Sequence, residues 1–424
     1  MDTIFALSSG APPAGIAIVR VSGPQAAPAL EALSGALPPE RQARRASLRD
    51  PAGDLLDQGL VLWFPGPNTV TGEDLAEFHL HGGRAVVGAI EAALAALPGL
   101  RRAEAGEFTR RAFANGRIDL VEAEGLADLL AAETELQRRA AIGMAGGALS
   151  LRVEAWRERL LGLSAQLEAA LDFEDEADGA RLPAQFQDEI KVLAGDLEEA
   201  LQSPVAEMLR EGFRVALAGP PNVGKSTLFN ALLENEAAIT APLAGTTRDV
   251  LVRTVALGGV PFTLVDMAGL REDSADPVEA VGIERAQAEI ARADLVLWLG
   301  GEGDGPEGAW EIQPQSDRSD HPAKAESRYR VSALTGENLA ALKQGLIEAA
   351  SGVMPKPGET ALNRRQRNLL GQALAALQEA QGESDPLLLA ESLRQARPAF
   401  DRLVGRTSTE DVLDALFGRF CIGK

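Results

Sequence analysis

The sequence has little cysteine and few aromatic residues: its 424 residues include one cysteine, one tyrosine and 4% aromatic side chains. The lone cysteine, Cys421, excludes a framework of internal disulfides and is typical of a reducing cytosol. No run of 18 consecutive apolar residues is present, so no membrane-spanning helix is expected. The first residues, Met1 to Phe5, lack the basic-then-apolar pattern of a signal peptide. We therefore expect a cytoplasmic protein that does not enter a membrane.

Basic residues are also scarce relative to acidic ones, and the formal net charge is −21. The deficit is uneven, because residues 1–117 hold 11 Lys and Arg against 12 Asp and Glu, whereas the remainder holds 30 against 50. Such acidity argues against indiscriminate binding of nucleic acid, which depends on a basic surface. Recognition of RNA through a small basic patch, or through a partner, stays open.

The most informative motif runs from Gly219 to Ser226 and fits G-x-x-x-x-G-K-[ST], a phosphate-binding loop. A short apolar strand is expected before it, at 213–218, and an apolar-striped helix after it, at 226–233. In such a loop, backbone N–H groups point at phosphate oxygens. Lys225 would reach the β- and γ-phosphates, and the Ser226 hydroxyl would ligate Mg²⁺. The alternative is a Gly-rich turn that binds nothing, and the order of strand, loop and helix disfavours it.

Two further segments favour a Ras-like GTPase. Asp266 ends an apolar strand and Gly269 follows it, in a D-x-x-G arrangement. Asp266 would hold Mg²⁺ through water, and the Gly269 N–H would sense the γ-phosphate. Between the two motifs, the segment Gly245 to Asp249 places Thr247 where a second hydroxyl could ligate Mg²⁺.

The guanine-recognition motif of a GTPase, N-K-x-D, is missing. The nearest candidate ends in Asp317, which could accept hydrogen bonds from guanine. Pro314 offers no side-chain amide, and Gln315 lacks the long stem and the charge of lysine. Downstream, Ser332 and Ala333 resemble a loop that contacts the guanine oxygen through N–H groups. The alternative is that Asp317 is an ordinary loop carboxylate.

Patterning along the chain predicts a multidomain protein. Residues 1–117 mix strand and helix signals and predict an α+β domain. Helical spacing over 118–211 and 351–424 predicts one all-α helical domain, and 212–350 alternate strands and helices as an α/β P-loop domain does. Helical flanks around an α/β module indicate that the Ras-like GTPase domain is inserted. Within it, the polar stretch from Gly300 to Lys324 is expected to be a loose loop.

Several segments together resemble the tRNA uridine-modification GTPase family MnmE (TrmE). Besides the GTPase motifs, they are Thr71–Asp74 with His81–Gly83, Gly106–Phe113, Asn115–Leu120 and Cys421–Lys424. The resemblance implies a homodimer formed through the N-terminal domain. It also implies modification of carbon 5 of the wobble uridine, position 34, in certain tRNAs, together with the FAD protein MnmG.

The resemblance further implies a reduced folate, 5-formyl- or 5,10-methylene-tetrahydrofolate, as donor of the one-carbon unit. On matching positions its contacts would be Arg20, Glu77, Arg117 and Lys424. Acidic and basic groups suit a pterin and a glutamate tail, although each residue taken alone is more typical of ordinary surface charge. Cys421 lies three residues before Lys424 in the sequence. It is either a reactive thiol or a small buried residue.

For the GTPase domain the family implies hydrolysis assisted by K⁺ in place of an arginine finger. The implied K⁺ ligands are Asn222, Ala241, Leu243 and Thr246. The implied catalytic residues are Lys225, Gly269 and Glu279, the last orienting the attacking water; without the resemblance, Glu279 reads as a solvated acid. The implied GTP contacts are Asn222, Val223, Gly224, Lys225, Ser226, Thr227, Thr246, Thr247, Asp266, Gly269, Asp317, Ser332 and Ala333, with Mg²⁺ on Ser226 and Thr247.

Two rival functions remain open at this point. One is a GTPase switch for ribosome assembly that binds RNA and performs no modification. Such proteins usually carry a basic RNA-binding domain after the GTPase module, and the region after residue 350 is of mixed charge. The other is a folate enzyme whose nucleotide site has decayed, which the intact Lys225, Ser226, Asp266 and Gly269 disfavour.

Overall fold

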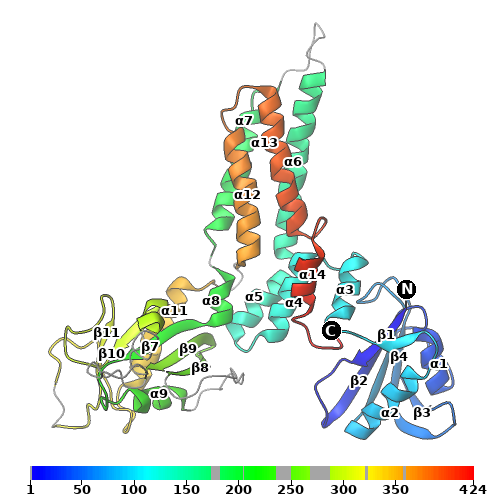
Figure 1. Ribbon diagram of the computed structural model, residues 1–424, viewed down its shortest axis with the longest axis horizontal. Helices are drawn as coiled ribbons and strands as arrows, with labels where there is room; N and C mark the ends of the chain where they lie inside the picture. Colours follow the sequence, from blue (N-terminus) through cyan, green and yellow to red (C-terminus); the bar gives the residue numbers. More distant parts are fainter. Residues whose placement is uncertain are drawn as a thin grey trace, which may run out of the picture. The chain divides into compact units, whose positions relative to one another are not determined.

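The computed structural model describes residues 2–172, 182–203, 205–234, 250–267, 287–319, 323–356 and 360–424. The chain forms two compact units (Figure 1). The first combines Met1–Ala127, Ser150–Glu154 and Phe400–Lys424, and the second combines Asp128–Leu149 and Ala155–Ala399. The last segment of the chain therefore folds with the N-terminal residues. The domain boundaries expected at 117, 211 and 350 stay predictions.

The first unit is built on a mixed sheet whose six described strands run in the order β3-β4-β5-β2-β1-β6. Neighbouring strands are antiparallel except β1 and β6, which are parallel. The strands are β1 Thr3–Leu7, β2 Ala14–Ser22, β3 Arg44–Arg49, β4 Leu55–Phe64, β5 Leu75–Gly82 and β6 Leu100–Arg102, and the helices between them are α1 Ala26–Ser34 and α2 Arg84–Ala95.

The two faces of this sheet carry different side chains because residues alternate along a strand. On β5, Phe78 and Leu80 are buried in a core shared with α1 and α2. Glu77 directly precedes Phe78 in the strand and therefore projects to the opposite face. On β2, Arg20 stands directly opposite Glu77 in the antiparallel register. The sheet thus pairs an acid and a base on the face that α1 and α2 do not cover.

The C-terminal tail packs on the N-terminal part of the chain. Helix α14 (Glu410–Phe417) lies against α3 (Glu107–Ala114), and Phe417 and Phe420 join a hydrophobic cluster with Leu120. Beyond it, Ile422 forms an antiparallel bridge with Ala105. These contacts return the last residues to the sheet of the first unit.

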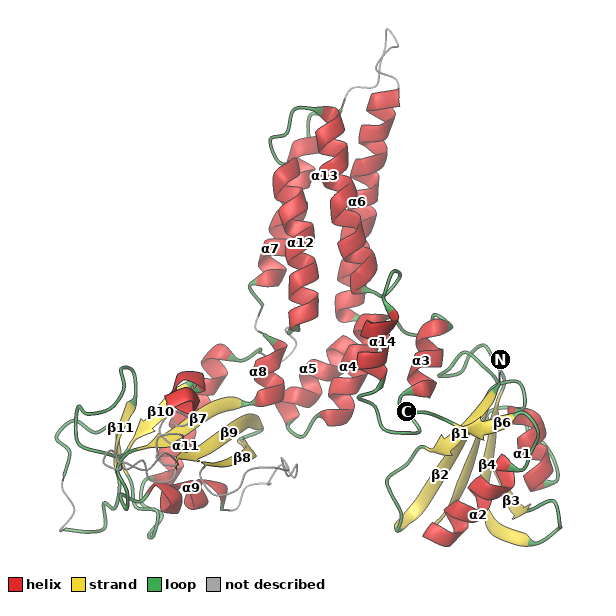
Figure 2. Cartoon of the chain, viewed as in Figure 1, coloured by secondary structure: helices red, strands yellow, loops and turns green. Residues whose placement is uncertain are grey.

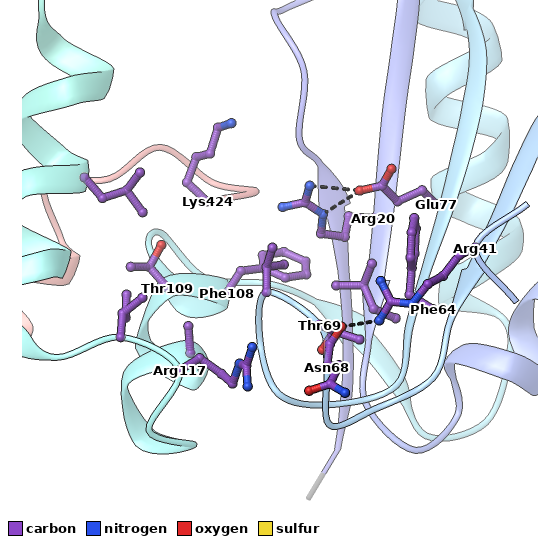
Figure 3. A pocket seen from close by; sticks show the side chains of 15 residues that line it. Arg20, Arg41, Phe64, Asn68, Thr69, Glu77, Phe108, Thr109, Arg117 and Lys424 are labelled. Carbon is purple, nitrogen blue, oxygen red and sulfur yellow. Dashed lines mark hydrogen bonds and ion pairs between the residues drawn. The ribbon is translucent and has the colours of Figure 1, made fainter. Parts of the chain in front are cut away.

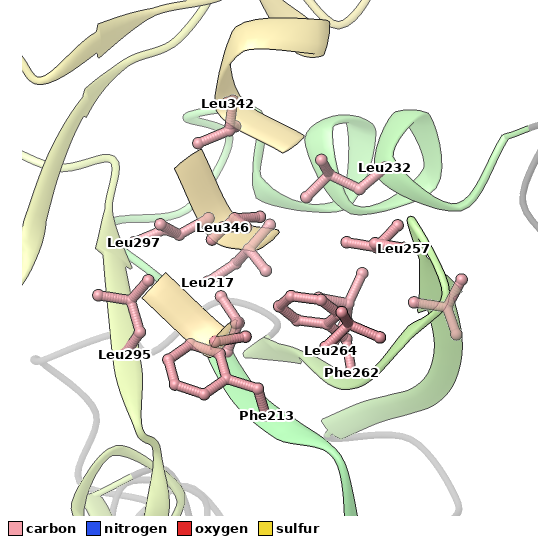
Figure 4. Close-up of a cluster of buried hydrophobic side chains, with 14 of the residues drawn as sticks. Phe213, Leu217, Leu232, Leu257, Phe262, Leu264, Leu295, Leu297, Leu342 and Leu346 are labelled. Carbon is pink, nitrogen blue, oxygen red and sulfur yellow. The ribbon is translucent and has the colours of Figure 1, made fainter. Parts of the chain in front are cut away.

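The second unit contains an α/β sheet in the order β12-β11-β10-β7-β9-β8, parallel at every described pairing except β8 with β9. Apolar residues of the sheet, among them Leu217, Phe262 and Leu264, pack against Leu342 and Leu346 (Figure 4). The elements are β7 Phe213–Ala218, α9 Lys225–Leu233, β8 Val250–Leu257, β9 Val260–Met267, β10 Leu295–Trp298, β11 Trp310–Gln313, β12 Tyr329–Arg330 and α11 Leu339–Val353.

Long helices make up the rest of the second unit (Figure 2). Helix α12 packs along α7, and the Arg367 guanidinium donates to the carbonyls of Leu201 (2.7 Å) and Ser203 (2.8 Å), which lie at the end of α7. The Leu201 carbonyl belongs to the last turn of α7 and has no partner within that helix, so Arg367 supplies one. The helices are α4 Leu120–Ala131, α5 Glu135–Ala145, α6 Ala148–Asp172, α7 Phe186–Leu201, α8 Ala206–Glu211, α12 Arg364–Ala380 and α13 Pro386–Leu403, with α4, α6 and α13 extending into the first unit.

The chain enters and leaves the α/β sheet at neighbouring points. Val205 and Leu362 form a parallel bridge, and the Ala206 N–H donates to the Leu362 carbonyl at 3.1 Å. The Glu207 carboxylate accepts from the Arg364 N–H at 2.9 Å, at the start of α12. The protein is therefore multidomain: an α+β N-terminal part, an all-α part, and a P-loop α/β module inserted into the helices. In the described ranges, no helix is both long and apolar enough to span a bilayer.

Candidate functional site

The loop between β7 and α9 has the backbone of a phosphate-binding loop. Gly219 and Gly224 have φ angles of 145° and 104°, which strain any residue with a Cβ. A Cβ at Gly219 would also lie 2.9 Å from the Gly300 nitrogen. Asn222 has a φ of 63° within the same turn. The two glycines and the turn at Asn222 let this loop curl back on itself ahead of the N-terminus of α9.

Lys225 is held inside this loop. Its ammonium donates to the carbonyls of Gly219 (2.9 Å) and Pro220 (2.7 Å), and 5% of the residue is exposed. Burial lowers the pKa of Lys225, and the charge of Asp266 opposes that shift. The loop thus carries a lysine at its centre, within reach of any anion that the loop binds.

Asp266 is a buried carboxylate that needs a ligand. It lies near the end of β9, opposite Leu217 of the neighbouring β7, and is fully buried. Within the described residues, neither of its carboxylate oxygens has a hydrogen-bond partner. Burying an ionised carboxylate without a partner is costly. A divalent cation bound near Asp266 and the exposed Ser226 would remove that cost, so these residues fit Mg²⁺.

Gln315 connects the expected base-binding loop to the phosphate-binding loop. Its side-chain amide donates to the Val223 carbonyl at 3.3 Å, and a Cβ on Gly224 would lie 3.4 Å from that nitrogen. Arg318 donates to the Gln315 side-chain oxygen at 3.3 Å. The sequence indicated only what glutamine lacks at this position. The structure adds that its side chain reaches the phosphate loop.

Hydrogen bonds also join the two loops that were expected to hold guanine. The Ser316 N–H donates to the Val331 carbonyl at 3.1 Å, and its hydroxyl bonds the Glu337 carboxylate at 2.7 Å. The Ser332 N–H donates to the Glu337 carbonyl at 3.1 Å. The exposed Asp317 therefore lies in a loop bonded to the one that carries Ser332 and Ala333.

Several expected residues lie outside the part of the chain that the structure describes. Their assignments to Mg²⁺, K⁺, γ-phosphate and water stay predictions. They are Ala241, Leu243, Thr246, Thr247, Gly269 and Glu279.

The first unit contains a cavity of about 560 Å³ (Figure 3). The four residues expected to contact folate, Arg20, Glu77, Arg117 and Lys424, all line it. This volume lies within the range of small-molecule sites. The other lining residues are Arg41, Phe64, Asn68, Thr69, Val70, Leu75, Phe108, Thr109, Ala112, Ile118 and Leu126.

Glu77 is the single acid among the lining residues. Arg20 donates to one of its oxygens at 2.9 and 3.1 Å, and the His79 ring lies 3.1 Å from the other. Burial raises the pKa of Glu77, but the bonds and charges of Arg20 and His79 outweigh it, so the net pKa is lowered. Glu77 is therefore ionised at neutral pH and can accept hydrogen bonds from a ligand.

Local turns place the two remaining expected residues. Arg117 follows Gly116, whose φ is 65°, and its N–H donates to the Ala112 carbonyl at 2.8 Å. Lys424 reaches the cavity at the end of the C-terminal tail, where a Cβ on Gly423 would lie 2.0 Å from the Leu7 carbonyl oxygen. Only glycine fits at that approach, so Gly423 lets the tail lie against β1.

Sequence reasoning missed Arg41, Phe64, Asn68 and Phe108, which also line the cavity. Phe108 belongs to one of the family-like segments and could have been found there. Arg20 lies 6.0 Å from its ring centroid. Arg41 belongs to no motif, so the sequence held no signal for it.

Of the two alternatives for Cys421, the small buried residue is wrong, and the side chains of Cys421 and Ile422 do not anchor the tail. Cys421 is exposed, Ile422 is 62% exposed, and neither lines the cavity. The anchors are instead the buried Phe417 and Phe420 together with the backbone bridge from Ile422 to Ala105. The role of Cys421 itself stays open.

Comparison with solved structures finds GTP-binding proteins that match parts of the chain. An Aquifex aeolicus Era variant bound to GDP and AlF4⁻ is 23% identical, covers 41% of this chain and 69% of its own, and has a TM-score of 0.25. The G domain of the T. maritima FeoB iron transporter is 27% identical, covers 32% of this chain and 98% of its own, and has a TM-score of 0.24.

Comparison with protein families and curated sequences covers the whole chain. The model for the GTP-binding protein TrmE N-terminus matches residues 3–117, and that for the MnmE helical domain matches 120–421. The tRNA modification GTPases MnmE of Erythrobacter litoralis (strain HTCC2594) and Novosphingobium aromaticivorans are 60% and 59% identical, each over the full length of both chains. The chain belongs to the MnmE family of tRNA modification GTPases.

Proposed function

We propose that this chain is a K⁺-activated GTP hydrolase that modifies tRNA. With a flavin-dependent partner of the MnmG type, it would act on carbon 5 of the wobble uridine, position 34, in certain tRNAs. A reduced folate would supply the one-carbon unit. The observation that carries this proposal is the presence in one chain of a phosphate-binding loop with an unpartnered buried carboxylate, Asp266, and of a separate cavity lined by cations. A ribosome-assembly switch that performs no modification would not need a cavity for a folate.

GTP phosphates would lie in the loop from Gly219 to Ser226. The N-terminus of α9 favours an anion there, and Lys225 would exchange its two loop carbonyls for phosphate oxygens. Mg²⁺ would be held by Ser226 and Thr247, with Asp266 acting through water. When bound, Mg²⁺ neutralises charge on the β- and γ-phosphates.

Guanine would be recognised by the two bonded loops. Asp317 would accept from the guanine N1 and N2 donors, and the backbone N–H groups of Ser332 and Ala333 would face its oxygen. Gln315 would hold this loop at a fixed distance from the phosphates through its bond to Val223. The shape of the site thus partly replaces the missing N-K-x-D side chains.

Hydrolysis would use Asn222 to hold K⁺ beside the phosphates, with carbonyls of Ala241, Leu243 and Thr246 as the other ligands. When bound, K⁺ supplies positive charge where other GTPases place an arginine finger. Glu279 would orient the attacking water, and the Gly269 N–H would contact the γ-phosphate. These residues come from the family resemblance.

The cavity of the first unit would bind 5-formyl- or 5,10-methylene-tetrahydrofolate. Ionised Glu77 can accept from the N–H groups of a pterin, and Arg117 and Lys424 can pair with carboxylates. We further propose a homodimer formed through the N-terminal domain, located in the cytoplasm.

The test is to delete the gene and to measure the nucleosides of bulk tRNA by mass spectrometry. Loss of the wobble-uridine modification is expected, with recovery on expression of the wild-type chain. Expression of Asp266→Asn should not restore the modification, because the nucleotide site is impaired. Expression of Arg117→Ala should not restore it either, because the cavity is impaired. An exposed-surface change such as Arg45→Ala should restore it fully. Unchanged wobble uridines in the deletion strain would refute the modification function.

A further inference from the structure

The charge of the cavity in the first unit exceeds what its acid can neutralise. Four cations line the cavity, and Glu77 pairs with one of them, Arg20, at 2.9 Å. In the described part of the chain, no carboxylate of another residue lies within 4.0 Å of Arg41, Arg117 or Lys424. Three cations are therefore left for a ligand. A ligand that satisfies them is an anion with more than one negative group.

We propose that Arg41 binds an additional carboxylate of a folate whose tail carries two or more glutamates. This inference rests on the proposed function, because it names the form of the same ligand. A folate with one glutamate has two carboxylates, which match Arg117 and Lys424 in number. Each added γ-linked glutamate brings one more carboxylate, and Arg41 is the cation that remains.

The backbone and two contacts hold Arg41 in place. Its φ is 57°, an uncommon value for a residue other than glycine, and its N–H donates to the Trp63 carbonyl at 2.8 Å. The guanidinium carbon lies 5.7 Å from the centroid of the Phe64 ring, and one nitrogen donates to the Asn68 carbonyl. A guanidinium fixed in this way loses little conformational freedom when it binds an anion.

Arg41 also lies apart from the two cations assigned to the first glutamate. In Figure 3, Arg41 and Phe64 lie on one side of the cavity, and Arg117 and Lys424 lie on the other. A ligand that pairs with Arg41 as well as with Arg117 and Lys424 needs a further anionic group, and an added glutamate supplies one.

A purely structural role for Arg41 predicts a different result. If the arginine only braces the loop that carries Asn68, its removal loosens the wall of the cavity for every folate. If it binds the added carboxylate, its removal weakens the longer ligand alone. The ratio of two affinities therefore separates the roles, because loosening of the wall cancels from that ratio.

The experiment is isothermal titration of the full chain with 5-formyl-tetrahydrofolate carrying one glutamate or three. We expect the wild type to bind the triglutamate about 1.4- to 5-fold more tightly, as suits one exposed ion pair. Arg41→Ala should bind the two ligands with equal affinity, whatever the loss of its contact with Asn68 does to both affinities. Arg45→Ala is the matched control, because this exposed arginine of β3 bonds Gln58 and does not line the cavity.

Three outcomes would overturn the inference. Equal affinity of the wild type for both ligands removes the preference that Arg41 is meant to explain. An equal loss of both affinities in Arg41→Ala assigns the residue to bracing the loop. If Arg41→Ala keeps the wild-type preference for the triglutamate, another residue causes that preference. Binding of neither ligand by the wild type would instead refute the folate function on which the inference rests.

Discussion

Replacing Gln315 by alanine should speed the release of GDP. The change removes the bond from the side-chain amide to the Val223 carbonyl, and it removes one acceptor of Arg318. One neutral hydrogen bond contributes about 0.5–1.5 kcal/mol. If that energy is lost only in the nucleotide-bound protein, dissociation quickens by about 2- to 13-fold, since 1.36 kcal/mol corresponds to a factor of ten. Gln315→Lys keeps a donor of similar reach and should release GDP no faster than the wild type.

The assay is stopped-flow displacement of a fluorescent GDP analogue from the full chain. Gln344→Ala is a suitable control, because its amide bonds only Glu348 on the exposed surface of α11. Thermal unfolding of each variant without nucleotide shows whether the module has stayed folded. Equal dissociation rates for the wild type and a folded Gln315→Ala would refute the idea that this bond fixes the base loop to the phosphate loop.

Four further predictions concern single parts of the two sites. GTP turnover should fall when Na⁺ replaces K⁺ and should become insensitive to the cation in Asn222→Ala; equal rates of the wild type in both salts would contradict the K⁺ site. Asp266→Asn should abolish Mg²⁺-dependent turnover yet raise the melting temperature of the metal-free protein, because it removes an unpartnered buried charge; a lower melting temperature would show that the carboxylate is satisfied. Arg20 and His79 lower the pKa of Glu77 below 4.5. The stability that ionised Glu77 contributes is therefore fully present above pH 4.5 and is lost as the pH falls through the lowered pKa. The difference in melting temperature between the wild type and Glu77→Gln should shrink below pH 4.5, and a constant difference would contradict this. Deletion of Cys421–Lys424 should weaken folate binding and abolish tRNA modification while GTP hydrolysis persists, and Gly423→Ala should act likewise by lifting the tail from Leu7; unaffected folate binding, or hydrolysis lost in a folded protein, would refute the tail's role.

The strands and helices with strong patterns were predictable from the sequence. The expected strand 213–218 and the helix after the phosphate loop are β7 and α9. The charged strand Arg44–Arg49 carried no apolar pattern and was not expected, since it lies at the edge of its sheet with Leu48 as its single fully buried residue. Apolar patterns in a sequence reveal strands whose side chains are buried, and a strand at the edge of a sheet buries few side chains.

Contacts between distant segments were less predictable. The stretch from Gly300 to Lys324 was expected to be loose, and this is wrong for its described part. The Lys324 ammonium is buried against the Trp298 carbonyl at 3.0 Å, and the Glu302 carboxylate accepts from the N–H groups of Ala325 and Glu326 at 2.8 and 2.7 Å. The stretch also contains the strand β11, and polar composition cannot show which polar groups bond to one another. The bond from Gln315 and the place of Arg41 escaped sequence reasoning for the same reason.

The bridge between Val205 and Leu362 bears on how such a protein could arise. Because the chain leaves the α/β module beside the point where it entered, the two helical segments that flank the module come together at its base. A gene segment encoding a complete nucleotide-binding module can therefore be spliced into a helical ancestor at one place, with no rethreading of the host. The same geometry makes the module exchangeable in the laboratory, for the Ala206–Leu362 hydrogen bond marks the pair of positions at which a related module can be grafted in frame.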